Sequence, residues 1–382
     1  MLNTFIIAGV IQAFLLGTFF IFHRTEINLP AHRILGIFFW LLSINLFAAS
    51  FFVSGKSYPY SWLIRIPEIM PFLYPPLIYG FTFSIIYQTT FSTKYWTILI
   101  APFFAGLFIL LPFYLQSPEE KIKVYQLMVK GIYPFSFYVL FIGKVIYGAL
   151  MIGISYYTII KYRRIIKSIF STLKEKDLRW LEYVLACLLL VWLVTTLRFF
   201  FLHSNISVYM PATFITVFIY VLSYFTLSQK ILLDTGDLEL LGQINTDKNS
   251  TNEKNDISAS QTQIDKKEAE EKYKRFFETT VSSKAYLDKE FTLGKMATLS
   301  GIRANTISEI LNKYYSINFY DFINKLRAEE VKESLESGKY QYLTIDALAQ
   351  QCGFKSKSTF YQSFKSLTGK TPAQFKKDLK NS

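Results

Sequence analysis

Polar side chains suited to contacting nucleic acid recur at helical intervals near the C-terminus of this 382-residue chain: Lys355, Lys357, Ser358, Gln362 and Lys365. Apolar Phe360, Phe364 and Leu367 alternate with them, which predicts a helix with one buried face and one face in solvent. Lysine binds phosphate or the guanine edge, and glutamine pairs with adenine. We therefore expect a helix whose exposed face is chemically suited to DNA.

A second short helix is predicted immediately before it. Ile345, Leu348, Ala349 and Cys352 are spaced i, i+3, i+4 and i+7, and Gly353 follows them. Glycine favours the positive φ that ends a helix, and Ser356 is suitably placed to cap the next one. Two short helices around a tight turn form a helix-turn-helix unit, whose second helix fits the major groove.

The same pattern occurs once more upstream, between Leu293 and Lys313. The first predicted helix of this unit ends at Gly301, and its second carries Ile307, Ile310, Leu311 and Tyr314 on one face. Between the two units, residues 319–338 predict an amphipathic helix of about 18 residues, or roughly 27 Å. Such a helix could hold two recognition helices roughly one DNA turn, about 34 Å, apart.

The tandem resembles the DNA-binding domain of AraC/XylS-family transcriptional regulators. The resemblance rests on ISEILNKYYSINFYDFINKLRAEEVK in the first unit and on ALAQQCGF, KSKSTFYQSFK and TGKTPAQF in the second. It covers about 90 of the 382 residues, and it is strongest to members whose DNA-binding domain follows a polytopic membrane domain. The resemblance implies base-reading positions at Asn305, Ser308 and Glu309 in the first unit and Lys357, Ser358 and Gln362 in the second.

Charge is distributed unevenly between the two predicted units. Residues 291–338 hold six basic and six acidic side chains, whereas residues 339–382 hold eight and two. We expect the second unit to supply most of the attraction to phosphate, with Lys355 and Lys365 as positioning contacts. Alternatively, any one of these lysines is an ordinary solvated residue. Glu309 can accept a hydrogen bond from cytosine N4, but an acid near phosphates is otherwise unfavourable.

Composition indicates that another part of the chain is buried in lipid. Hydrophobic residues make up 51% and aromatic residues 18%, and the mean hydropathy of +0.26 is too high for a wholly soluble chain. The net charge of +13 divides into +11 for residues 1–233, −3 for 234–267 and +5 for 268–382. Two separated cysteines and three scattered histidines imply no disulfide framework and no metal site.

Seven apolar runs are long enough to cross a bilayer, which needs about 20 residues. They are Thr4–Phe22, Ile34–Val53, Trp62–Ile86, Tyr95–Leu115, Phe137–Ile160, Leu181–Leu202 and Val208–Leu227. The third run contains four prolines, Arg65 and Glu68, so it predicts a kinked helix or a re-entrant segment. We expect an all-α protein with a seven-helix transmembrane bundle at residues 1–233, followed by a soluble helical domain with two helix-turn-helix units.

Loop charges orient this bundle. Residues 161–180 carry seven lysines and arginines, whereas the loops on the opposite side hold only four lysines. The positive-inside rule places residues 161–180 and the C-terminus in the cytoplasm, as expected for a multi-pass protein of the bacterial cytoplasmic membrane. Apolar residues from Tyr162 to Leu173 predict either a basic amphipathic helix on the inner leaflet or an extension of the bundle helices.

Charged residues within the predicted spans require a partner or water. The candidates are Arg65, Glu68, Lys144 and Arg198, all toward the outer ends of their helices. One hypothesis is a polar signal pocket open to the outside, in which Glu68 pairs with Arg65. The alternative is that the long side chains extend to the headgroups or cross-link the bundle.

Residues 242–267 are nearly free of large apolar side chains, which predicts a flexible polar linker within residues 234–267. From Glu268, helical spacing resumes through Tyr273, Phe276 and Phe277, so residues 268–382 form the predicted DNA-binding domain. About 26 linker residues reach roughly 25–30 Å.

The predicted function is a membrane-embedded one-component transcriptional regulator with no enzymatic activity and no cofactor. Its expected partners are double-stranded DNA, the lipid bilayer and a small-molecule or membrane signal, with a homodimer and RNA polymerase as further candidates. The alternative is a membrane sensor whose C-terminal domain binds a protein. No histidine lies beyond residue 203, which disfavours a sensor kinase, and the absence of a duplicated membrane half disfavours a transporter.

Overall fold

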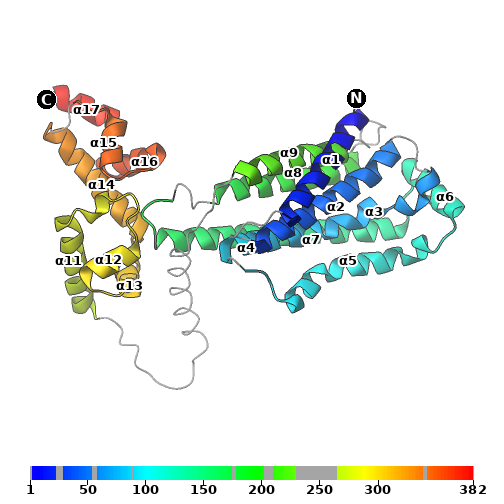
Figure 1. The fold of residues 1–382 in the computed structure, drawn as a ribbon, viewed down its shortest axis with the longest axis horizontal. Helices are drawn as coiled ribbons and strands as arrows, with labels where there is room; N and C mark the ends of the chain where they lie inside the picture. Colours follow the sequence, from blue (N-terminus) through cyan, green and yellow to red (C-terminus); the bar gives the residue numbers. More distant parts are fainter. Residues whose placement is uncertain are drawn as a thin grey trace, which may run out of the picture. The chain divides into compact units, whose positions relative to one another are not determined.

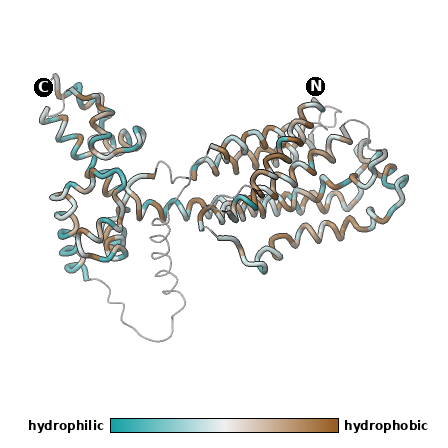
Figure 2. The backbone as a smooth tube through the Cα atoms, in the orientation of Figure 1, coloured by the Kyte–Doolittle hydropathy of each residue, from teal (hydrophilic) through white to brown (hydrophobic). Residues whose placement is uncertain are grey.

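The computed structural model describes residues 2–22, 29–53, 58–87, 89–173, 178–201, 210–228, 265–338 and 342–381. These residues form helices of the α and 3-10 types, as Figure 1 shows, which confirms the predicted all-α class. They divide into two compact units. Figure 2 shows the contrast between the mostly hydrophobic N-terminal helices and the mixed C-terminal ones.

Seven helical segments of the described residues are long and apolar enough to cross a membrane, which confirms the number predicted. Six are continuous helices, and the remaining segment, Tyr60–Tyr87, is broken. The continuous helices are α1 (Leu2–Phe22), α2 (Leu29–Val53), α5 (Thr93–Tyr114), α7 (Phe135–Lys167), α8 (Arg179–Phe201) and α9 (Met210–Ser228).

Close packing of α1 against α2 depends on small residues. A Cβ atom on Gly17 would lie 2.2 Å from the ring of Trp40, so this position has no room for a side chain. Buried Phe38 of α2 packs edge-on against Tyr74 and Phe218, which brings α4 (Tyr74–Tyr87) and α9 to the same face of α2. Contacts between aromatic rings therefore join three helices in the core of the N-terminal unit.

The broken segment consists of η1 (Tyr58–Leu63), α3 (Ile66–Ile69), η2 (Met70–Phe72) and α4 (Tyr74–Tyr87). Proline at the first turn of α3 and of η2 removes an amide donor that a continuous helix would need, so the helix restarts at each proline. The predicted break is confirmed. The two alternatives, a segment that crosses the bilayer and one that re-enters it, stay predictions.

Helix α6 (Pro118–Val129) was not predicted. It lies between α5 and α7 and begins with a capping box, in which Ser117 and Glu120 each accept a hydrogen bond from the other's backbone amide. The Ser-x-x-Glu spacing is a recognised helix start. The helix is too polar to have appeared among the apolar runs.

The C-terminal helices begin with α11 (Lys266–Ser282), whose buried Phe276 packs against Phe322. This confirms the predicted leading helix. The remaining elements are η4 (Ala285–Leu287), α12 (Leu293–Ser300), α13 (Ala304–Tyr314), α14 (Phe319–Glu336), α15 (Ile345–Gln351), α16 (Lys357–Thr368) and α17 (Pro372–Asn381). Apart from its last three residues, the predicted linker 234–267 lies outside the described residues.

The stretch from Tyr162 to Leu173 matches one of the two sequence interpretations in part, because α7 extends the predicted fifth span as far as Lys167. The amphipathic pattern is helical only as far as Lys167, and the chain is extended or irregular from there to residue 173. Residues 162–173 belong to the same compact unit as the C-terminal helices. The boundaries between the two units therefore lie within α7, after Lys161, and just before α8, as well as between α9 and α11.

Candidate nucleic-acid interface

The first helix-turn-helix unit is formed by α12 and α13. Gly301 ends α12 in the left-handed conformation, with φ of 69°, as its position in the sequence predicted. Ile307, Ile310 and Leu311 are fully buried on the inner face of α13. This burial fixes the rotation of α13 and leaves its opposite face toward solvent.

The second unit is formed by α15 and α16. Gly353 has φ of 90°, and a Cβ atom there would lie 2.7 Å from the carbonyl oxygen of Leu287 and 2.8 Å from Nε of Arg327. Glycine is needed at this turn both for its backbone conformation and for the close approach. Ser356 is the N-cap of α16, as predicted, but its hydroxyl bonds to Ser358 instead of to a helix amide.

Helix α14 connects the two units. Asn318 caps its first turn by accepting a hydrogen bond from the amide of Asp321, 2.9 Å away. Buried Ala328 and Val331 join the core of the second unit, and the hydroxyl of Tyr320 lies 3.1 Å from that of Thr359 on α16. α14 is thus part of the core that holds the second recognition helix.

The candidate DNA-contact residues of the second unit lie on one side of α16. Ser358, Gln362 and Lys365 are spaced i, i+4 and i+7, and all three are exposed. Lys357 is exposed beside them and donates a hydrogen bond of 2.7 Å to Asp346, which raises the pKa of its ammonium group. Lys357 is therefore charged at neutral pH and already held at the start of the helix.

Lys355 lies before α16, in the turn, and pairs with Glu290 of the loop that leads into α12. The contact joins the turn of the second helix-turn-helix unit to the loop that precedes the first unit. A lysine engaged in this way contributes less to phosphate binding than a solvated one, because the acid offsets its charge.

The candidates of the first unit lie together on α13. Glu309 is exposed, whereas Asn305 and Ser308 are half-buried beside it. Lys313, one turn further on, lies 3.6 Å from Glu309. This pair offsets the acidic charge, which removes part of the expected repulsion from phosphate.

Two exposed residues of the first unit were missed by the sequence analysis. Arg303 is the N-cap of α13, and Asn312 lies seven residues after Asn305 on the same stripe. Asn312 also donates a hydrogen bond of 2.7 Å to the carbonyl of Ser308. Helical spacing from Asn305 would have identified Asn312, and the exposed position just before the helix would have identified Arg303.

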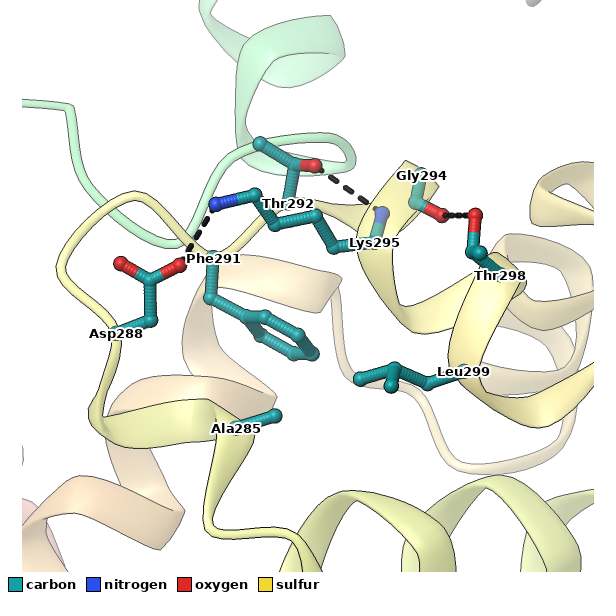
Figure 3. A pocket seen from close by; sticks show the side chains of 8 residues that line it. All are labelled: Ala285, Asp288, Phe291, Thr292, Gly294, Lys295, Thr298 and Leu299. Carbon is teal, nitrogen blue, oxygen red and sulfur yellow. Dashed lines mark hydrogen bonds and ion pairs between the residues drawn. The ribbon is translucent and has the colours of Figure 1, made fainter.

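An open depression at the start of α12 is not part of this face. Figure 3 shows Asp288 and Lys295 pointing toward one another at its edge, where their charged groups lie 2.7 Å apart. None of the eight candidate DNA-contact residues lines it; its walls are Ala285, Asp288, Phe291, Thr292, Gly294, Lys295, Thr298 and Leu299.

In the N-terminal unit, the structure brings Arg65 and Glu68 together. Nη2 of Arg65 lies 2.8 Å from Oε2 of Glu68, and Nη1 donates to the hydroxyl of Ser136 at 3.1 Å. Arg65 has the left-handed φ of 71° and its guanidinium lies over the ring of Phe113. Lys144 lies over Phe141, whereas the side chain of Arg198 lies outside the described residues.

Comparison with known proteins addresses the C-terminal unit. A family model described as a helix-turn-helix domain matches residues 296–378, from within α12 to within α17. No curated protein and no solved structure matches the chain. Among the described residues, no group of histidine, cysteine and acidic side chains could hold a metal ion.

The fold and this match define the class of the C-terminal domain: it is a DNA-binding helix-turn-helix domain of the kind found in transcription regulators. The match also supports the resemblance to the AraC family over these 83 residues. It does not extend to the seven apolar helices.

Proposed function

We propose that this protein is a membrane-embedded one-component transcriptional regulator, in which a seven-helix input domain controls a tandem helix-turn-helix domain on the cytoplasmic side. The observation that carries the proposal is the presence in one chain of seven candidate spans and a matched DNA-binding domain. Because both parts belong to one polypeptide, a signal received in the bilayer needs no phosphotransfer to reach DNA.

Exposed apolar side chains support insertion in a bilayer. On α7, Ile142, Ile146 and Leu150 are spaced one turn apart and each is more than half exposed. On α5, Phe104 and Phe108 are exposed in the same way. Stripes of this size on a soluble monomer are unfavourable in water, whereas lipid tails solvate them without penalty.

Sequence-specific reading is assigned to α13 and α16. Gln362 and Asn305 suit adenine, and Lys357 suits the N7 and O6 atoms of guanine. Lys365 is assigned to phosphate, which it would bind without regard to sequence. Because Glu309 offsets the charge of Lys313 on its own helix, the first unit contributes less net positive charge than the second.

The Arg65–Glu68 pair is the proposed signal-responsive element of the input domain. Its side chains are 2% and 13% exposed, so each charge depends on the other for stabilisation. An anionic or hydrogen-bonding ligand would compete with Glu68 for the guanidinium, and Lys144 and Arg198 are the further candidate contacts. Breaking the pair leaves a buried charge without its partner, and this loss of stabilisation would favour a rearrangement of the surrounding helices.

Changes in helix packing or in association of protomers are the proposed output. Two tethered DNA-binding domains bind neighbouring sites at high effective concentration, so dimerisation in the bilayer would raise apparent affinity without new contacts. RNA polymerase is the proposed partner of the DNA-bound form.

The test begins with genome-wide footprinting of the full-length protein and continues with binding of the recovered duplex to protein in nanodiscs. We expect the logarithm of affinity to fall linearly with the logarithm of salt concentration, by about 0.9 per phosphate neutralised. Affinity that is independent of salt, or capture of a protein in place of DNA, would support the alternative sensor that binds a protein partner.

Variants of α16 separate the two kinds of contact. Gln362→Ala should weaken binding by about 1–3 kcal/mol and relax specificity at one base pair, whereas Lys365→Ala should reduce the salt slope by about one. Lys325→Ala, an exposed lysine on α14, is the matched control for loss of one positive charge. Equal effects of Lys365→Ala and Lys325→Ala would show that Lys365 does not contact the DNA, which would contradict the placement of α16 in the interface.

A further inference from the structure

A short stretch between α7 and α8 is built into the DNA-binding domain. Residues 169–173, which we call the docking segment, lie one residue beyond the end of α7 and belong to the C-terminal compact unit. Ile169, Phe170 and Ser171 are all at most 2% exposed. Side chains that would be solvated in a free loop are therefore enclosed here.

Backbone hydrogen bonds join the docking segment to the start of the first helix-turn-helix unit. The amide of Leu293 donates to the carbonyl of Ile169 at 2.8 Å, and Phe170 and Thr292 form an antiparallel bridge. Leu293 is the first residue of α12, where amides have no partner within the helix. The docking segment supplies that partner, so it completes the N-terminal cap of α12.

Side-chain contacts join the same segment to α14 through Arg327. The guanidinium is 1% exposed; Nη1 donates to the carbonyl of Ser171 at 3.2 Å, and Nη2 donates to its hydroxyl at 3.0 Å. Buried Asn324 donates to the same carbonyl at 3.3 Å. The hydroxyl of Ser171 in turn donates to the carbonyl of Phe291 at 2.6 Å.

Two further hydrogen bonds join Arg327 to η4 and to the loop before α12. Nε donates to the carbonyl of Tyr286 at 2.7 Å and Nη2 to that of Asp288 at 2.8 Å. Burial lowers the pKa of Arg327 to about 10, so the group is still charged at neutral pH. A buried cation needs hydrogen-bond partners for its donors. If the docking segment withdrew, Arg327 would lose its two hydrogen bonds to Ser171.

A further contact points toward the second unit. The ammonium group of Lys167 lies 5.8 Å from the ring centroid of Tyr320, whose hydroxyl contacts Thr359 of α16. The docking segment therefore contacts α12 directly. Lys167, just before it, is linked to α16 through the side chain of Tyr320. One of these helices, α12, precedes the first recognition helix, and the other, α16, is the second recognition helix.

We propose that the docking segment couples the input domain to DNA binding by bracing α12 against α14. The segment is joined covalently to α7 on one side and, through residues 174–178, to α8 on the other, so a movement of either helix acts on it directly. When docked, it holds the first unit in the geometry that binds DNA; when withdrawn, α12 loses its cap and Arg327 loses partners. The coupling rests on the proposed function, whereas the docking itself does not.

The test uses full-length protein in nanodiscs and hydrogen–deuterium exchange at the amides of Leu293 and Ser171. In the wild type we expect slow exchange at both. Ser171→Ala removes two hydrogen bonds, one of them from a cation, and should speed exchange at Leu293 by about tenfold or more. Phe170→Asp places a charge in the buried site and should release the segment fully.

Ser168→Asp is the matched control, because it adds the same charge two residues away, where the native hydroxyl donates to the carbonyl of Ile165 in the last turn of α7. It should change exchange at Leu293 by less than about twofold. Wild-type exchange as fast as that of Phe170→Asp would overturn the docking. Ser171→Ala, which is too mild to unfold the domain, keeps the result decisive if Phe170→Asp fails to fold.

Binding of the footprinted duplex tests the coupling separately. Because coupling is reciprocal, DNA should slow exchange at Leu293 of the wild type, and Phe170→Asp, which releases the segment, should weaken DNA binding. Wild-type exchange at Leu293 that DNA does not slow would overturn the coupling and leave the proposed function standing. A wild type that binds no DNA would instead overturn the proposed function and the coupling together, while the exchange data still decide the docking.

Discussion

At the scale of single residues, Gly353 is where the second helix-turn-helix unit meets the rest of its domain. Its backbone has φ of 90°, and its α-carbon faces the carbonyl of Leu287 and the guanidinium of Arg327. Position 353 must therefore carry no side chain, both for the turn between α15 and α16 and for the burial of Arg327.

Gly353→Ala should lower the free energy of unfolding of this domain by about 2–5 kcal/mol, from the left-handed backbone and from overpacking together. Gly369→Ala is the matched control: its φ is 73°, but no atom lies within 4 Å of the added Cβ, so it should lose only about 1–2 kcal/mol. Pulse proteolysis of the full-length protein in urea measures both, and equal losses would contradict the close contact.

Cys352, next to this glycine, should be chemically inert in the folded protein. Burial raises the pKa of its thiol to about 12. At pH 8 roughly one thiol in ten thousand is then the reactive thiolate, and reactivity should rise as pH increases toward the pKa. In a Cys187→Ser background, maleimide labelling at pH 8 should be slow until urea unfolds the domain; rapid labelling of the native protein would contradict it.

At the scale of elements, the helices of the C-terminal unit differ in how their first turns are satisfied. Thr344 caps α15 by accepting from the amide of Ala347 at 3.2 Å. Ser356 occupies the same position in α16 without such a bond, because its hydroxyl is 2.8 Å from that of Ser358. α12 is capped both by Thr292 and by the docking segment.

Thr344→Ala should therefore cost about 1 kcal/mol of domain stability, a typical loss for a helix cap. Ser356→Ala should cost only a few tenths of a kcal/mol, because no helix amide loses its partner. Urea-dependent pulse proteolysis gives both values side by side. A larger loss for Ser356→Ala would show that the hydroxyl caps α16 in solution.

At the scale of the whole molecule, orientation in the bilayer decides whether the DNA-binding domain can reach DNA. The seven candidate spans are odd in number, so the chain ends of the N-terminal unit lie on opposite sides if all seven cross. The basic stretch 161–180 and the C-terminus then share one side.

Lys123→Cys on α6 and Lys377→Cys on α17 test this arrangement in a background without native cysteines. In intact cells, a membrane-impermeant maleimide should label the variant at position 123 and not the variant at position 377, because positive loops stay cytoplasmic. After lysis, both should be labelled, which serves as the control for accessibility. Labelling at position 377 in intact cells would place the domain away from DNA.

The sequence alone determined the features that depend on local periodicity and composition. Apolar runs of spanning length gave the seven helical segments, because a bilayer imposes a minimum length. Spacing of three and four residues and the glycines at 301 and 353 gave the paired helices, because local backbone preferences end a helix wherever they occur. The candidate residues on α16 follow from the same periodicity.

Only the tertiary structure decided which residues distant in sequence share a core. Arg327 and Asn324 lie four and seven residues before Val331, on the apolar face of α14, yet nothing in that spacing identifies Ser171, about 150 residues away, as their partner. The apolar side chains of residues 162–173 suit a leaflet, a bundle or a protein core equally well, because hydrophobic burial has no direction. Specific hydrogen bonds to Arg327 and Leu293 select among these environments, and those bonds exist only in the folded chain.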